Sequence, residues 1–203
     1  SLKESVYMNL PRAIDIDVDG SGNLFVCDWR GGRFKFAGKG KKVGMVQKLT
    51  KKGLKGQPFP TLKGMSTSEL VSQLKSPSAV RRLEIQRVLL ARAGTGSIKP
   101  LINFIKDSRL SIESRIAAIF TLSQMKGMTA DQFLQIFAKD WKDLKEIQQY
   151  LTRAAGDLSG AISSDTLSLV ERVLQSGDER TRLQAVVFLM RTGNPAKNAT
   201  AQI

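Results

Sequence analysis

Three aspartates near the start of the chain have the spacing of a cation-binding loop. Asp15, Asp17 and Asp19 alternate with apolar residues and are followed by Gly20. Carboxylates at alternate positions with a glycine at the sixth are the opening of a calcium loop, whose twelfth position needs a bidentate carboxylate. That position is Val26. The simpler interpretation, which we favour, is a strand that ends in an Asp-Gly hairpin turn, and we expect no metal and no other cofactor in this chain.

The residue types that most often carry catalysis are scarce. The 203-residue chain has no histidine and one cysteine, Cys27. Histidine is the commonest general base and metal ligand, and one cysteine forms neither an internal disulfide nor a Cys-x-x-Cys-His haem attachment. No glycine-rich phosphate loop opens a helix after a strand. We therefore predict that this chain is not an enzyme, and that Cys27 is a small apolar residue of a strand.

The chain is strongly basic, with a formal net charge of +14. Seven lysines fall between Lys39 and Lys55 with no acid among them. Such an excess suits a nucleic-acid partner, but a solvated hairpin whose lysines discourage edge pairing explains the cluster equally well. Four arginines of the later helices are the candidates for a basic binding surface: Arg81, Arg82, Arg87 and Arg115. The alternative for Arg82 is a bond to a neighbouring loop.

Period-two alternation places short strands in residues 1–52. Ile14, Ile16 and Val18 alternate with the aspartates, which predicts a strand over 13–18 with one buried apolar face. A glycine-rich turn at 20–23 follows. Further strands are predicted at 24–27, 33–37 and 43–49, which together make a four-stranded antiparallel up-and-down sheet the size of one propeller blade.

From Thr67 the apolar period changes to 3.6, which indicates helices. Residues 53–66, with two prolines and three glycines, form a linker before them. Four second helices of similar sequence recur, and Arg82 and Arg115 stand at the same offset before Gly94 and Gly127. We predict an α-solenoid of about four HEAT-like helix pairs over 67–193 and a frayed tail over 194–203. The predicted helices are 67–74, 77–94, 97–106, 112–125, 129–138, 144–158, 165–174 and 179–191.

The strand–turn–strand IDIDVDGSGNLFVCDW, followed by a Gly-Gly turn and then by the arginine-rich helix PSAVRRLEIQRVLLARAG, resembles one family. It is similar to the large membrane-bound dehydrogenases of planctomycetes and verrucomicrobia, in which a sorbosone/glucose-dehydrogenase-like β-propeller is followed by HEAT repeats and a haem-binding domain. The resemblance implies an extracytoplasmic fragment that holds the last propeller blade and the repeats. Because this chain lacks histidine and Cys-x-x-Cys-His, no catalytic or haem-binding position carries over.

The resemblance implies a non-catalytic scaffold that links the propeller to the cytochrome c-type domain, with those neighbouring domains or another protein as partners. The alternative is a nucleic-acid-binding repeat protein that uses its basic face. Trp141 with Asp140 and Asp143 is the one cluster similar to the base-trapping residues of helical-repeat DNA-alkylation enzymes, and we expect Trp141 instead to be a packing anchor. No apolar run has the length of a membrane span.

Overall fold

The computed structural model describes residues 12–29, 44–50, 53, 56–92, 95–176 and 178–193. The chain divides into two compact units. The first, here called the sheet unit, extends to Pro60 and includes Ser78–Val80, and the second, the helical unit, holds the rest from Thr61 onward. The change from one unit to the other at Pro60 falls inside the linker predicted for 53–66.

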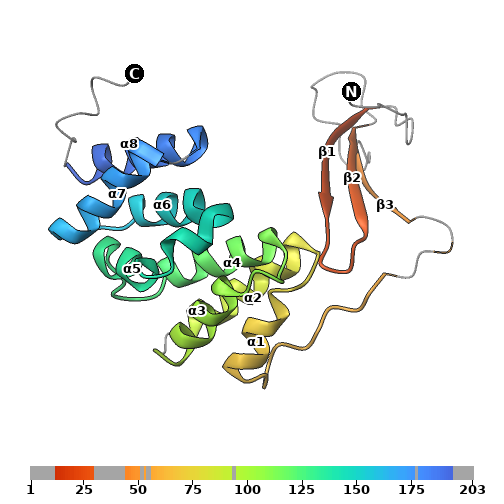
Figure 1. Ribbon diagram of the computed structural model, residues 1–203. Coiled ribbons are helices and arrows are strands. Elements are labelled where there is room, and N and C mark those ends of the chain that lie inside the picture. The colour runs from red at the N-terminus through yellow and green to blue at the C-terminus, as the bar shows by residue number, and fades with distance from the viewer. Residues whose placement is uncertain are drawn as a thin grey trace. The chain divides into compact units, whose positions relative to one another are not determined.

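The sheet unit is built on three antiparallel strands in the order β1-β2-β3. Three of the predicted strands are confirmed, and the prediction for 33–37 lies outside the described residues. The up-and-down order, with 33–37 between the second and last strands, is wrong, because β2 pairs directly with β3 in the register Val26 opposite Gln47. A strand has two edges, and those of β2 are occupied by β1 and β3. The strands are β1 (Ala13–Val18), β2 (Leu24–Trp29) and β3 (Gly44–Leu49) (Figure 1).

A three-residue turn joins β1 to β2. The Asp19 carbonyl accepts a bond of 3.0 Å from the Gly22 N–H, and Gly22 has a φ of 81°. A tight turn closed by one left-handed residue is a common hairpin connection, and glycine takes that conformation without strain. The Asp19 carboxylate accepts bonds from the backbone N–H groups of Ser21 and Asn23, at 2.9 and 2.8 Å. The glycine-rich sequence therefore does serve a turn, as predicted.

The predicted burial of one face of β1 is wrong. Ile14, Ile16 and Val18 are 68%, 60% and 42% exposed, whereas Val26 on the central strand is 2% exposed. The reason is position in the sheet. A central strand has neighbours on both sides, while β1 pairs only with β2 among the described strands.

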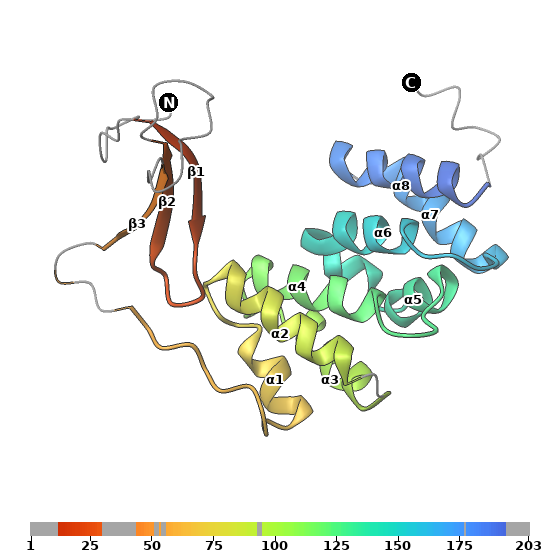
Figure 2. The same ribbon diagram turned by 180° about the vertical axis from the view of Figure 1, so that it is seen from behind.

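The described helical unit holds eight α-helices near the predicted positions, here called four successive pairs in chain order (Figures 1 and 2). The helix predicted over 144–158 is divided, because Leu144 leaves helical geometry (φ −103°, ψ 23°) and the stretch before Gln148 is a 3₁₀ segment. The helices are α1 (Thr67–Gln73), α2 (Ala79–Ala91), α3 (Ile98–Lys106), α4 (Ile112–Ser123), α5 (Ala130–Phe137), α6 (Gln148–Gly156), α7 (Ser164–Ser176) and α8 (Glu179–Arg191), with 3₁₀ segments η1 (Thr95–Ser97) and η2 (Trp141–Ile147).

Side-chain caps explain where several helices begin. Ser66 and Glu69 form a capping box at α1, in which the Ser66 N–H donates to the Glu69 carboxylate at 2.7 Å. Thr129 and Gln132 form a second box at α5. A cap satisfies backbone N–H groups that have no partner inside the helix. Asp178 does the same at α8, where its carboxylate accepts bonds from two backbone N–H groups.

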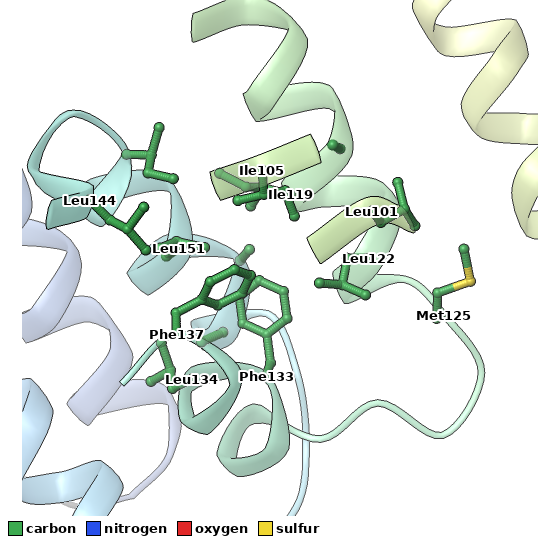
Figure 3. Close-up of a cluster of buried hydrophobic side chains, with 14 of the residues drawn as sticks. Leu101, Ile105, Ile119, Leu122, Met125, Phe133, Leu134, Phe137, Leu144 and Leu151 are labelled. Atoms are coloured by element: carbon green, nitrogen blue, oxygen red, sulfur yellow. The ribbon is translucent and has the colours of Figure 1, made fainter. Parts of the chain in front are cut away.

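One continuous apolar core runs through the helical unit. First helices contact first helices (α1 with α3, α5 with α7), and second helices contact second helices (α4 with α6, α6 with α8). Phe133 and Phe137 form an edge-to-face pair with ring centres 5.6 Å apart inside this core (Figure 3). Gly156 lets α8 approach α6 closely, since a Cβ built there would lie 3.4 Å from the Cα of Phe188. Among the described residues, no helix has the length and apolarity to cross a membrane.

Candidate interaction surface

Arg82 and Arg115, the two arginines at the same offset, each lie in the first turn of a second helix and donate to backbone carbonyls of the chain that precedes it. The Arg82 guanidinium donates to the carbonyls of Ser76 and Pro77 at 2.7 and 3.0 Å. The Arg115 Nε donates to the carbonyl of Ile105 at 2.8 Å. The Ile105 carbonyl lies in the last turn of α3, where carbonyls have no partner within their own helix, so Arg115 joins the two helices of its pair. Ser76 and Pro77 lie in the loop after α1, so Arg82 binds a neighbouring loop, which was the alternative predicted for it.

Arg115 is not a surface residue, and its prediction as part of a binding surface is wrong. Its side chain is 2% exposed, and its Nη1 contacts the Glu146 carboxylate at 3.2 Å. A buried charge is stable only when it is paired and hydrogen-bonded, and the Ile105 carbonyl and Glu146 provide both. The pattern of apolar residues could not distinguish this arginine from an exposed one, but its shared offset with Arg82 was a signal.

The remaining candidate arginines do not form one patch of unpaired charge. Arg87 is exposed and forms a two-point ion pair with Glu84, at 2.6 and 2.8 Å. Arg81, on the same helix, is half-buried. Arg92 extends back to the segment before α1, where it donates to the carbonyls of Met65 and Leu62. Of the four arginines predicted as a binding surface, the structure therefore uses at least three within the fold itself.

Polar contacts join the last three helix pairs at similar sequence separations. Lys106 forms an ion pair with Asp140 at 2.5 Å, 34 residues away, and Arg115 reaches Glu146, 31 residues away. The remaining contacts span 31, 32 and 34 residues: Gln135 to Thr166, Ser163 to Asp131, and Arg191 to Asp157. These five contacts are here called the repeat links. They indicate a structural period of 31–34 residues over the last three pairs. The shared offset of Arg82 and Arg115 had indicated a similar period for the first two pairs.

The three aspartates of the predicted calcium alternative form backbone contacts in the sheet unit. Asp15 and Asp17 each accept a bond from the N–H of the following residue, at 2.8 and 2.7 Å. Asp19 holds the turn, and the hydrogen bond from the Asn23 side chain is the main cause that lowers its pKa. The structure brings no three metal-ligating side chains together anywhere in its described residues.

Trp141 lies half-buried against the core of the helical unit, as expected for a packing anchor. Of its acidic neighbours, Asp140 forms an ion pair with Lys106. A shallow open depression lies nearby, between η2, α6 and the start of α8, and its lining mixes both signs of charge: Lys145, Glu146, Gln149, Asp178, Glu179 and Arg180. A mixed lining favours neither an anion nor a cation.

The described helical unit also has exposed apolar side chains, on its first and last pairs. Leu83 on α2 is 64% exposed, and Leu183 and Met190 on α8 are 59% and 73% exposed. Leu183 and Met190 are seven residues apart and therefore lie on one side of α8. Comparison of the chain with protein-family models, with curated proteins and with solved structures finds no match.

Proposed function

We propose that this chain is a non-catalytic scaffold, in which a short α-solenoid of HEAT-like helix pairs holds protein partners at a fixed separation. The observation that supports this most is the set of repeat links, whose members all span 31–34 residues. These contacts connect the second pair to the third and the third pair to the fourth. An array of that kind is a rod whose stiffness depends on the interfaces between its repeats.

The use of polar groups in the helical unit agrees with a structural role. Arg82, Arg92 and Arg115 donate to backbone carbonyls, and Lys106 is paired with Asp140. Polar side chains that bond within the fold fix the geometry between its helices. Such a chain offers a stable surface to a partner rather than a group poised for reaction.

The resemblance of residues 11–94 to membrane-bound dehydrogenases names the partners that this scaffold would hold. In that arrangement the helical unit connects a β-propeller to a cytochrome c-type domain in an extracytoplasmic protein. This part of the proposal depends on the resemblance alone. Detection of upstream blades and a downstream Cys-x-x-Cys-His in the gene would support it, and a gene without them would refute it.

Rigidity of the helical unit can be measured by electron–electron distance spectroscopy. Spin labels at Leu83→Cys and Met190→Cys, in a Cys27→Ser background, occupy exposed positions on α2 and α8. A scaffold predicts one narrow distance distribution. Several distances or a broad distribution in the unmodified helices would refute the proposal.

A matched pair of variants tests whether the repeat links cause the rigidity. Arg115→Met removes the contacts to Ile105 and Glu146 but keeps an apolar stem, and it should broaden the distribution. Arg182→Met removes an exposed arginine of α8 and should leave the width unchanged. Equal widths for the two variants would show that the links do not determine the stiffness.

The charge supports a second candidate, a nucleic-acid-binding repeat protein. Residues 61–193 hold 19 Lys and Arg residues against 13 Asp and Glu residues. Binding through phosphates releases counterions, so affinity for a labelled duplex should fall steeply with salt, with a log–log slope of about −0.9 per phosphate contacted. Retention that does not change with salt, or absence of retention at 50 mM salt, would eliminate this candidate.

A further inference from the structure

We infer that the outer edge of β1 is a docking site for an extended peptide segment in which basic and apolar residues alternate. The site comprises the backbone of Asp15–Val18, which follows an irregularity in the pairing between Ala13 and Asp15, the apolar side chains of this strand on one face and the carboxylates of Asp15 and Asp17 on the other. It lies in the sheet unit and does not depend on the scaffold proposed for the helical unit.

The hydrogen-bond pattern shows which backbone groups face outward. The Asp19 N–H donates to the Asn23 carbonyl across the hairpin, at 2.9 Å. In an antiparallel pair, bonded and non-bonded positions alternate along the strand. The N–H groups of Asp17 and Asp15 therefore point toward β2, and those of Val18 and Ile16 point away from it. No described strand pairs with β1 on that outer side.

Within the described residues, the two outward N–H groups donate to side chains of the same strand. The Ile16 N–H donates to the Asp15 carboxylate at 2.8 Å, and the Val18 N–H donates to the Asp17 carboxylate at 2.7 Å. Both contacts are exposed and local. A carbonyl of an added strand can replace each carboxylate as the acceptor of the outward N–H group. The displaced aspartate can then accept a bond from another donor, because an ionised carboxylate has several acceptor sites.

The two faces of β1 specify the side chains of the partner. Ile14, Ile16 and Val18 are all more than 40% exposed on their face, so apolar side chains of an added strand would bury apolar area there. On the other face Asp17 lies opposite Phe25, and Phe25 lies opposite Lys48. The Lys48 ammonium is 5.9 Å from the Phe25 ring centre. A lysine or arginine of the partner would sit beside Asp17 on its open side and extend this row.

The same charges argue against the other occupants of a free edge. Among the described residues neither Asp15 nor Asp17 has an ion-pair partner. An antiparallel second copy of β1 would place aspartates of both chains on one face, and like charges opposite each other are destabilising. Phosphates of a nucleic acid would meet the same two carboxylates. A basic strand is the occupant whose charge is complementary, and addition of a strand to a sheet edge is an established mode of peptide recognition.

The test uses the full chain and a labelled ten-residue peptide that alternates lysine and valine, in 150 mM salt, where charges more than about 8 Å apart are screened. A peptide that alternates glutamate and valine is the control. We expect the lysine peptide to bind, with backbone amide shifts confined to Ala13–Val18, and the glutamate peptide not to bind. Equal binding of both peptides, or shifts in β3 or the helices instead, would overturn the inference.

Ile16→Pro removes an outward N–H without removing a bond to β2, and proline is tolerated at such an edge position. Ile16→Ala is its control, because it shortens the side chain and keeps the N–H. Proline should abolish binding and alanine should retain it, and equal effects of the two would contradict docking through the backbone. If Ile16→Pro does not fold, Asp15→Asn with Asp17→Asn is the deciding variant. The loss of two cross-strand charge pairs should weaken binding about 2- to 30-fold, and unchanged affinity would overturn the proposed choice of partner.

Discussion

Replacement of Arg115 tests the contact that joins α3 to α4. Arg115→Ala removes a buried donor from the Ile105 carbonyl and about two methylenes of buried stem. A hydrogen bond from a charged group contributes about 1.5–3 kcal/mol, and each buried methylene contributes about 0.8 kcal/mol. The pair with Glu146 adds about 0–1 kcal/mol, because the Glu146 side chain is 72% exposed. We expect the free energy of unfolding to fall by about 3–5 kcal/mol.

Two further variants separate the parts of this sum. Arg115→Met keeps most of the stem and also relieves the desolvation of the guanidinium, so its cost should be about 1–3 kcal/mol, mainly from the unsatisfied carbonyl. Glu146→Gln should cost less than about 1 kcal/mol. The expected order of destabilisation is therefore Arg115→Ala, then Arg115→Met, then Glu146→Gln.

The measurement is urea unfolding of the full chain, followed by circular dichroism at 222 nm, with the slope compared between variants. A change in slope would show that unfolding has become less cooperative, as repeat arrays allow. The reasoning is refuted if Arg115→Met is as stable as the unmodified chain, since the hydrogen bond would then not exceed the desolvation of its donor. It is equally refuted if Glu146→Gln costs as much as Arg115→Ala.

The remaining predictions concern packing, a turn and pH. Phe137→Ala, at a fully buried position in the core, should cost about 3–5 kcal/mol in the same urea assay, and Ile136→Ala, at a half-buried neighbouring position, should cost clearly less. Gly22→Ala, at a φ of 81° with open space around the Cβ, should destabilise the sheet unit by about 1–2 kcal/mol, seen as faster amide exchange in β1 and β2; unchanged exchange would contradict the turn. Hydrogen bonds from Arg109 lower the pKa of Asp107 from 3.8 to about 2, and the bond from the side chain contributes more than the bond from the backbone N–H. As the pH falls, the Asp107 carboxylate is therefore protonated in the unfolded chain before it is protonated in the folded chain. The contact with Arg109 stabilises the fold above pH 4, and this stabilisation is lost as the pH falls toward 2. Asp107→Asn should lower the urea midpoint at pH 5 but not at pH 2, and an equal difference at both values would contradict this origin.

Local signals in the sequence predicted the elements of the helical unit. The 3.6 period predicted the helices near their observed bounds, and α1 begins at a capping box of Ser66 and Glu69. These signals are contacts within a few residues, so they can be recognised without the tertiary fold. The α-helix predicted over 144–158 begins only at Gln148, because Leu144 leaves helical geometry and the residues before Gln148 form a 3₁₀ segment.

The parts that sequence reasoning missed depend on contacts between distant residues. Alternation in Ile14, Ile16 and Val18 predicted a strand, but its burial depended on whether the strand lay at the centre or the edge of the sheet. Arg115 looked like a surface cation because its partners, Ile105 and Glu146, are 10 and 31 residues away. The shared offset of Arg82 and Arg115 was the clue, because both donate to backbone carbonyls that precede their helix, in a loop for Arg82 and in α3 for Arg115.

The repeat links have a consequence for how such a chain changes over evolutionary time. Because each link joins a helix pair only to its neighbour, duplication of one pair lengthens the array by about 8–10 Å without a new kind of interface. Insertion or deletion of a few residues inside a pair would instead shift several links out of register at once. Changes in the reach of this helical unit are therefore expected in whole repeats, and related chains should differ in length by multiples of 31–34 residues.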